Sequence, residues 1–458
     1  MIKAGFVGFG EVNTPKEIIV KKCAAAHDLL HTQGIDTVSV YPVTDDYEER
    51  DIAHALDVLG SEDFDCLVLC VAGWIPTHAV LKITEHYRHI PMVLWGLCGW
   101  VEGDRLITTA DQAGTSALRG SMASLGYTFS YIYDIVGLPS RADRVAAYCR
   151  AASAAKRLRH ARVGFGGYRD MNLYGTQADG TSLKRVVGPE IETFELLEIY
   201  QRSEHFSDAE KDEIVTLMKQ GGEYRGRYMK PWSFVKPAAE TGMRRAAGDF
   251  LAVDALIRER GYDGISLKDV DGMKRLLGFP PAPVFMLLSD LSGVCTVPEN
   301  DCLGSITQLM VKYLTGQCAM YLEFYEFFTD RVLAGVPDYI PAETTEGTVT
   351  VMPAAFGELS EGILNVSKVK TGELTLCRLS SVGDRYVMHM VRGFGKTPRK
   401  WEEAGWTQPA PQLPGLEIML DDVEDFAEKV MGQHYIISYG NNTAELRALC
   451  DMLGIKVI

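Results

Sequence analysis

Long apolar runs are missing from this chain of 458 residues. No stretch approaches the ~18–20 uncharged apolar residues that a membrane-spanning helix needs. The first ten residues, MIKAGFVGFG, also lack the basic start, the long apolar core and the small-residue cleavage site of a secretion signal. We therefore expect a cytoplasmic protein that does not bind or cross a membrane.

Basic charge and paired cysteines are scarce as well. Lys and Arg together number 46 against 61 Asp and Glu, which gives a formal net charge of −15. Nucleic-acid binding needs clustered basic side chains, so this balance argues against a nucleic-acid partner. The 10 cysteines show no C-x-x-C spacing, and they are read as reduced, mostly buried thiols. These absences are consistent with a protein that carries out chemistry on a small molecule.

The first third of the chain has the pattern of a parallel sheet. Apolar runs at residues 2–9, 65–72 and 91–95 end near Gly or Pro, and a helical pattern covers residues 15–31. Continuous apolar runs are typical of parallel strands that are covered on both faces. At roughly 100–200 residues per domain, the length favours three domains. We predict that residues 1–158 form a doubly wound α/β domain.

The rest of the chain predicts one more α/β domain and then a change of class. A basic helical stretch leads into a second doubly wound domain at residues 159–338. Beyond it, apolar and polar residues alternate with period two, and Gly383-Asp384 gives a hairpin signal between two such runs. The alternating segments are residues 347–351, 374–379 and 386–392. We predict that residues 339–458 form a strand-rich antiparallel C-terminal domain.

Ligands of parallel α/β sheets bind outside the carboxyl ends of the strands, so the strand-end loops are candidate site positions. Gly8-x-Gly10 follows the first strand, but Asn13 replaces the third glycine of a dinucleotide-binding loop. An ordinary strand-end loop is the better interpretation. Trp74 and Trp100 each stand just past a predicted strand, where an aromatic side chain either packs in a core or an interface or stacks on a sugar ring.

Four ionisable side chains are candidates for a functional site. Glu299 and Asp301 follow Pro298 in a polar loop before an amphipathic helix, where they could also be an acidic helix start. Glu323 lies in the apolar run AMYLEFYEFF, so it is either bound to a partner or a metal, or it faces solvent on a strand. His434 is a lone histidine before a strand, and such a residue is most often structural.

The run from Pro298 to Gln317 resembles a segment of the L-fucose/L-arabinose isomerase superfamily. There a Glu two residues before an Asp precedes a helix ending in "Leu-Thr-Gly", and another carboxylate follows about seven residues after that glycine. Residues 432–434 (GQH) resemble the terminal metal-binding histidine of the superfamily, and residues 166–173 (GGYRDMNL) its second strand-end loop. The order of the domains also matches.

The resemblance implies a ketol isomerase that moves a proton between C1 and C2 through an ene-diol. Glu299, Glu323 and His434 would bind one cation, best Mn²⁺, with Mg²⁺ or Co²⁺ as substitutes, and the two carboxylates would carry the proton. The expected substrate-binding residues are Trp74, Trp95, Arg169, Met171, Lys268, Asp301 and Gln433. The resemblance also implies a trimer-based homohexamer with sites at subunit contacts, and Gly96–Trp100 is expected at such a contact.

One departure and two rival functions remain. Relatives carry His-Cys-Gly where this chain has residues 354–357 (AAFG), which disfavours L-arabinose itself. Arg169 and Lys268 follow predicted strands and could meet an anionic group, so a sulfo sugar is as open as a deoxy or pentose sugar. The rivals are a sugar-binding protein without catalysis, built from two α/β lobes, and a nicotinamide-dependent dehydrogenase resting on the glycine loop.

Overall fold

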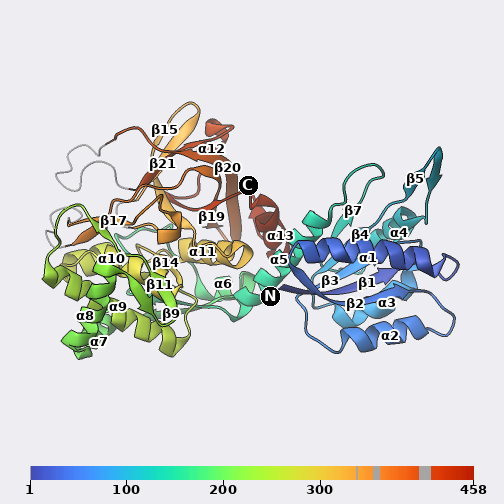
Figure 1. Ribbon diagram of the computed structural model, residues 1–458, viewed down its shortest axis with the longest axis horizontal. Helices are drawn as coiled ribbons and strands as arrows, with labels where there is room; N and C mark the ends of the chain where they lie inside the picture. Colours follow the sequence, from blue (N-terminus) through green and yellow to red (C-terminus); the bar gives the residue numbers. More distant parts are fainter. Residues whose placement is uncertain (1, 337–338, 354–361, 402–413) are drawn as a thin grey trace. The chain divides into compact units, whose positions relative to one another are not determined.

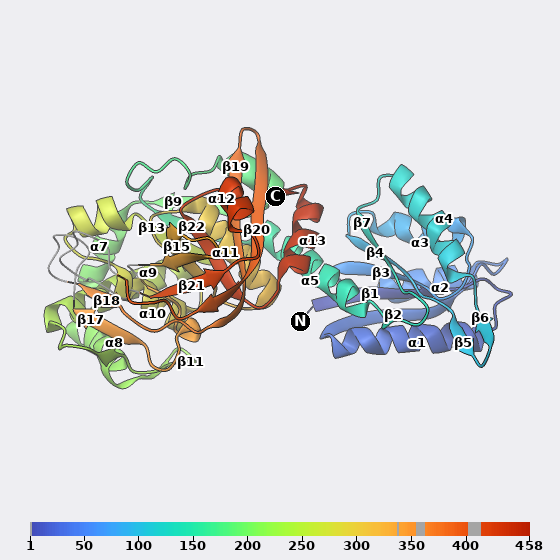
Figure 2. The same cartoon turned by 90° about the horizontal axis from the view of Figure 1, so that it is seen from above.

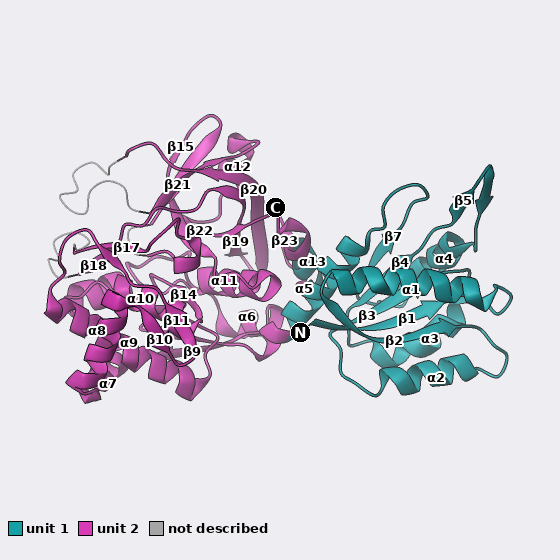
Figure 3. Ribbon diagram, in the orientation of Figure 1, with its two compact units in different colours: residues 1–156, 447–452 teal, residues 157–446, 453–458 magenta. Residues whose placement is uncertain are grey.

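A computed structural model describes residues 2–336, 339–353, 362–401 and 414–458. The chain separates into two compact units (Figure 3). Unit 1 comprises residues 1–156 and 447–452, and unit 2 comprises residues 157–446 and 453–458. Within the described ranges, no helix combines the length and the apolar character that a membrane span requires.

Unit 1 is built on a parallel sheet with the strand order β2-β1-β3-β4-β7. Its strands are β1 (Ile2–Phe9), β2 (Ile35–Val43), β3 (Cys66–Val71), β4 (Met92–Gly96) and β7 (Phe129–Tyr133), and β5 (Trp100–Glu102) with β6 (Arg105–Ile107) forms a small hairpin. The covering helices are α1 (Lys16–Thr32), α2 (Arg50–Leu59), α3 (Thr77–Thr84), α4 (Asp111–Ser124) and α5 (Ala142–His160). Apolar residues of α1 and α5 join one core and those of α2, α3 and α4 another, so the sheet is covered on both faces (Figure 1). This confirms the predicted parallel α/β sheet.

Unit 2 begins with a second parallel sheet, in the order β14-β13-β8-β9. Its strands are β8 (Arg162–Gly166), β9 (Glu190–Phe194), β13 (Gly264–Leu267) and β14 (Cys295–Val297). The helices of this part are α6 (Gly180–Val186), α7 (Leu196–His205), α8 (Asp208–Gln220), α9 (Glu240–Arg260), α10 (Ala282–Leu287) and α11 (Cys302–Thr315). Two segments, η2 (Asp269–Leu276) and η3 (Leu288–Ser292), are π-helical. Such wide turns often accompany functional sites, and η2 directly follows the carboxyl end of β13.

The C-terminal part of unit 2 is strand-rich, as predicted. In the described residues, six antiparallel strands pair in the order β19-β22-β15-β16-β21-β20, and β19 also pairs with β20, which closes the ring into a barrel. The strands are β15 (Met320–Phe327), β16 (Arg331–Gly335), β19 (Gly372–Val382), β20 (Arg385–Lys396), β21 (Gly415–Met419) and β22 (His434–Tyr439). The β19–β20 hairpin, with its turn at Gly383, is prominent in Figure 2.

The expected boundary at residue 338 cuts through this barrel. β15 and β16 precede the boundary, yet they pair with β22 and β21. Conversely, the strand expected at residues 347–351 begins later, as β17 (Thr350–Pro353), and joins β12 (Ser233–Phe234) and β18 (Ile363–Asn365) in a separate sheet. The remaining elements are β10 (Gly222–Tyr224), β11 (Arg227–Met229), β23 (Lys456–Val457), α12 (Val423–Lys429) and α13 (Thr443–Leu453). The second sheet and the barrel therefore belong to one compact unit.

Candidate metal centre

Strand pairing brings two of the three expected ligands together. Glu323 on β15 lies directly opposite His434 on β22 in the antiparallel register. Directly opposed residues of an antiparallel pair point to the same face of the sheet. The distance between His434 Nε2 and Glu323 Oε2 is 3.7 Å. Strand pairing thus brings together two residues that are far apart in the sequence.

Glu299 reaches the same histidine from the loop between β14 and α11. Its Oε2 lies 3.5 Å from His434 Nδ1. The backbone of Glu299 and Asn300 has positive φ angles of 61° and 49°. For a residue other than glycine this left-handed conformation costs on the order of 1–3 kcal/mol. Hydrogen bonds hold the loop, since Glu299 N donates to Asp269 Oδ1 (2.7 Å) and Asn300 N to the Leu267 carbonyl (2.9 Å). Strain that the surroundings impose next to converging ionisable groups is typical of functional sites.

His434 is buried and electrically neutral. Its ring stacks on Tyr321, with the ring centroids 4.2 Å apart and the planes 12° from parallel. Burial, and then the positive charge of Arg378, lower the pKa of His434 well below its ordinary value. A neutral imidazole keeps a lone pair on one ring nitrogen, which is the form that binds a metal cation.

Asp301, expected in contact with a substrate, is engaged inside the protein instead. It is 1% exposed. Its Oδ1 accepts hydrogen bonds from Gly304 N (2.9 Å), at the start of α11, and from Arg378 Nη2 (3.1 Å). Its Oδ2 accepts from the Tyr321 hydroxyl (2.8 Å) and from Arg378 Nη1. The substrate-binding expectation for Asp301 is therefore corrected, because it caps a helix and anchors the aromatic ring that lies under His434.

The donor set suits a divalent cation, although its present arrangement does not surround one point. Two carboxylates and a neutral imidazole are ligands that Mn²⁺ accepts. Two ligands about 2.1 Å from one ion lie at most about 4.2 Å apart, and both contacts of His434 are shorter. However, Glu299 faces Nδ1 and Glu323 faces Nε2, and no three His, Cys, Asp or Glu side chains of the described residues form a ready ion-binding group. Binding one ion therefore requires one carboxylate to swing or the ring to turn.

Other expected residues lie at the edge of the second sheet from which Glu299 also comes. Arg169 and Met171 follow β8, and Lys268 follows β13. Loop contacts tie this edge together, because Asn300 Nδ2 donates to the Tyr168 carbonyl (2.8 Å) and Met171 N to Asp271 Oδ2 (2.9 Å). Since strands of a parallel sheet end at one edge, these loops and Glu299 border the same region.

The expected substrate contacts Trp74, Trp95 and Gln433 differ in their exposure to solvent. Trp95 is fully buried in the core of unit 1, where its Nε1 donates to Asp134 Oδ1 (3.2 Å). This corrects the expectation that Trp95 contacts a sugar, because a side chain enclosed by core atoms has no surface for a ligand. Trp74 is 38% exposed, also in unit 1. Gln433 is exposed, and its carbonyl accepts a hydrogen bond from Phe324 N (3.1 Å).

The structure adds residues that the sequence interpretation did not select. Tyr321 stacks directly on His434, Arg378 is linked to Tyr321 through Asp301, and Asp269 holds the backbone of Glu299. Two of them left a signal in the sequence. Tyr321 stands two residues before Glu323, and Arg378 continues the period-two positions of Leu374 and Leu376. A polar group at an apolar-face position calls for a buried partner.

Comparison with known proteins adds no assignment, since the sequence matches no protein-family model and no curated protein. Residues 354–357 (AAFG), which differ from the His-Cys-Gly of the L-fucose/L-arabinose isomerases, lie outside the described residues. The feature that points to a function is therefore the convergence of Glu299, Glu323 and His434.

Proposed function

We propose that this chain is a divalent-cation-dependent aldose–ketose isomerase, similar to the L-fucose and L-arabinose isomerases. The observation that supports the proposal is the position of Glu299 and Glu323, which come from separate segments and flank the neutral imidazole of His434. The carboxylates lie 3.5 and 3.7 Å from the two ring nitrogens of His434, and a cation bound among them would offset their mutual repulsion. A pair of acid–base groups beside a cation-binding nitrogen is what ketol isomerisation needs.

In this proposal Glu299, Glu323 and His434 hold the cation, which is Mn²⁺ or, in its place, Mg²⁺ or Co²⁺. When bound, the ion would supply positive charge that makes the C–H next to the sugar carbonyl more acidic. One carboxylate takes the proton from C2 and returns it to C1, while the second carries the hydroxyl proton from O2 to O1. No atom is gained or lost, so an aldose becomes its ketose.

Metal removal is the first test. Protein treated with a chelator and then dialysed should lose ketose formation against a panel of aldoses, and Mn²⁺ should restore it better than Ca²⁺, which prefers more oxygen ligands. Saturating Mn²⁺ should also raise the melting temperature, because a ligand that binds only the folded state stabilises it by RT ln(1 + [L]/Kd).

The same experiment separates the rival functions. A sugar-binding protein without catalysis would bind an aldose and release it unchanged, with or without metal. A dehydrogenase would require a nicotinamide cofactor. Sugar binding with no ketose formed by the Mn²⁺-loaded protein would contradict the isomerase proposal.

A second prediction concerns the charge of the substrate. If the sugar carries an anionic group, Arg169→Ala or Lys268→Ala should raise KM by about 10–150-fold, since a charge-assisted hydrogen bond contributes roughly 1.5–3 kcal/mol. Steady-state kinetics with the best sugar of the panel measures this change. An unchanged KM in both variants would remove these residues from the substrate site.

The proposal includes a trimer-based homohexamer. We expect residues 96–100, which precede and enter the β5–β6 hairpin of unit 1, to lie at a subunit contact near another subunit's metal centre. Light scattering on the active protein tests this. A fully active monomer would contradict it.

A further inference from the structure

A cavity lies in unit 2, away from the candidate metal centre. Its volume is about 670 Å³, within the range of small-molecule sites. None of Glu299, Glu323 and His434 lines it. It includes Lys312 and Gly316, at the carboxyl end of α11, whereas Asp301 caps the amino end of this 14-residue helix. A helix of that length spans about 21 Å, so the two places are separate sites.

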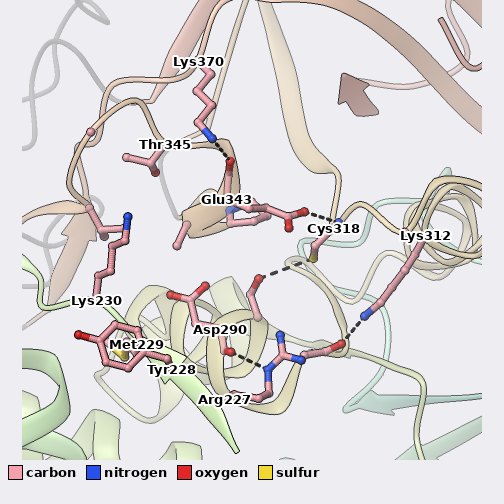
Figure 4. A pocket seen from close by; sticks show the side chains of 17 residues that line it. Arg227, Tyr228, Met229, Lys230, Asp290, Lys312, Cys318, Glu343, Thr345 and Lys370 are labelled. Atoms are coloured by element: carbon pink, nitrogen blue, oxygen red, sulfur yellow. Dashed lines mark hydrogen bonds between the residues drawn. The ribbon is translucent and has the colours of Figure 1, made fainter. Parts of the chain in front are cut away.

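Four basic side chains gather around this cavity (Figure 4). The lining includes Arg227, Lys230, Lys312 and Lys370. Within the described residues, none of these four side chains forms an ion pair with a carboxylate. Three of them donate to backbone carbonyls instead, through Arg227 Nε to Asp290 (2.8 Å), Lys370 Nζ to Glu343 (2.7 Å), and Lys312 Nζ to Gly293. In a protein of net charge −15, such a local excess of cations attracts anions.

Two acidic side chains in the lining offset only part of this charge. Burial raises the pKa of Asp290 to about 7, so this carboxyl group carries less than a full negative charge near neutral pH. The Glu343 carboxylate accepts a hydrogen bond from Cys318 N. The four basic groups come from three segments, namely β11 with the residue after it, α11, and the segment before β19. They therefore line the cavity from several sides.

We propose that this cavity binds a small phosphorylated molecule. A phosphate monoester carries nearly two negative charges and three acceptor oxygens, so it can take hydrogen bonds from several cationic donors at once. The Tyr228 ring also lines the cavity and is 70% exposed, which leaves a face for the ring of the attached group. The proposal does not depend on the isomerase activity, because it uses none of the metal-centre residues.

Calorimetry on metal-free protein tests the proposal with three probes, which are inorganic phosphate, glucose 6-phosphate and glucose. Chloride keeps the ionic strength constant. We expect both phosphates to bind and glucose not to bind. Lys230→Gln and Lys370→Gln should each weaken binding of glucose 6-phosphate by about 10-fold or more, as expected for a lost charge-assisted contact. Lys236→Gln is the matched control, since Lys236 is exposed and outside the lining, and it should bind as the wild type does.

Two results would overturn the proposal. One is that the wild type shows no phosphate binding at the highest practical concentration. The other is weakening of the same size in Lys236→Gln as in the two cavity variants, which would show a general effect of net charge. Thermal unfolding of each variant shows whether it is folded, and Lys230→Gln replaces an exposed side chain, so its folding should be unaffected.

Discussion

Glu299→Gln should lower kcat by about 10²–10⁴-fold with the best aldose while leaving sugar binding largely intact. The amide has the shape of the carboxylate but cannot accept a proton, so the variant loses acid–base catalysis, which contributes a factor of this size. Its charge is also lost beside His434, where Glu299 Oε2 lies 3.5 Å from Nδ1. Steady-state kinetics at saturating Mn²⁺ measures the loss of kcat, and calorimetry measures whether sugar binding is retained.

The neighbouring carboxylates of β15 supply the control. Glu323→Gln should reduce kcat as Glu299→Gln does, because Glu323 faces the other ring nitrogen of His434. Glu326→Gln makes the same chemical change three residues further along the strand, where the side chain is exposed, and it should retain full activity. A Glu299→Gln enzyme with wild-type kcat would remove this residue from the reaction.

Arg378→Met should lower the free energy of unfolding by about 3–5 kcal/mol. Arg378 is 3% exposed and forms an ion pair with Asp301, which is itself 1% exposed. Removing one partner leaves the other charge buried without its counter-ion, and this costs more than the pair itself contributes. Urea denaturation monitored by circular dichroism measures the change.

Two further variants make the result specific. The double variant Arg378→Met with Asp301→Asn should recover part of the loss, because neither charge is then buried alone. Arg392→Met breaks the exposed pair with Glu373 on β19 and should cost less than about 1 kcal/mol. If Arg378→Met were as mild as Arg392→Met, the buried pair would not be needed for the fold.

Much of the fold could be predicted from hydrophobic patterns alone. The run at residues 2–9 is β1, the pattern at 15–31 lies within one residue of α1, and the hairpin signal Gly383-Asp384 joins β19 to β20. In each case the local pattern and the tertiary environment agree. The sequence did not show that β15 and β16 leave the α/β region to join the barrel, because strand partners are chosen by contacts between distant segments.

The candidate site, too, could be predicted from the sequence only in part. Glu299, Glu323 and His434 could be selected from the sequence through the resemblance, and the structure places them side by side. The fates of Asp301 and Trp95 could not be predicted, since strand-end position does not reveal whether a side chain is enclosed. Asp301 is enclosed by Arg378 and Tyr321, and Trp95 by the core of unit 1.

The position of β22 in the barrel has a consequence for biosynthesis. β22 lies between β19 and β15, although it is made last of the three. Until the ribosome has added residue 439, β15 and β19 each lack a neighbour, and unpaired strand edges promote aggregation. His434 arrives with the same strand. The nascent chain therefore cannot assemble the candidate metal centre before the barrel closes, so a truncated product would lack both.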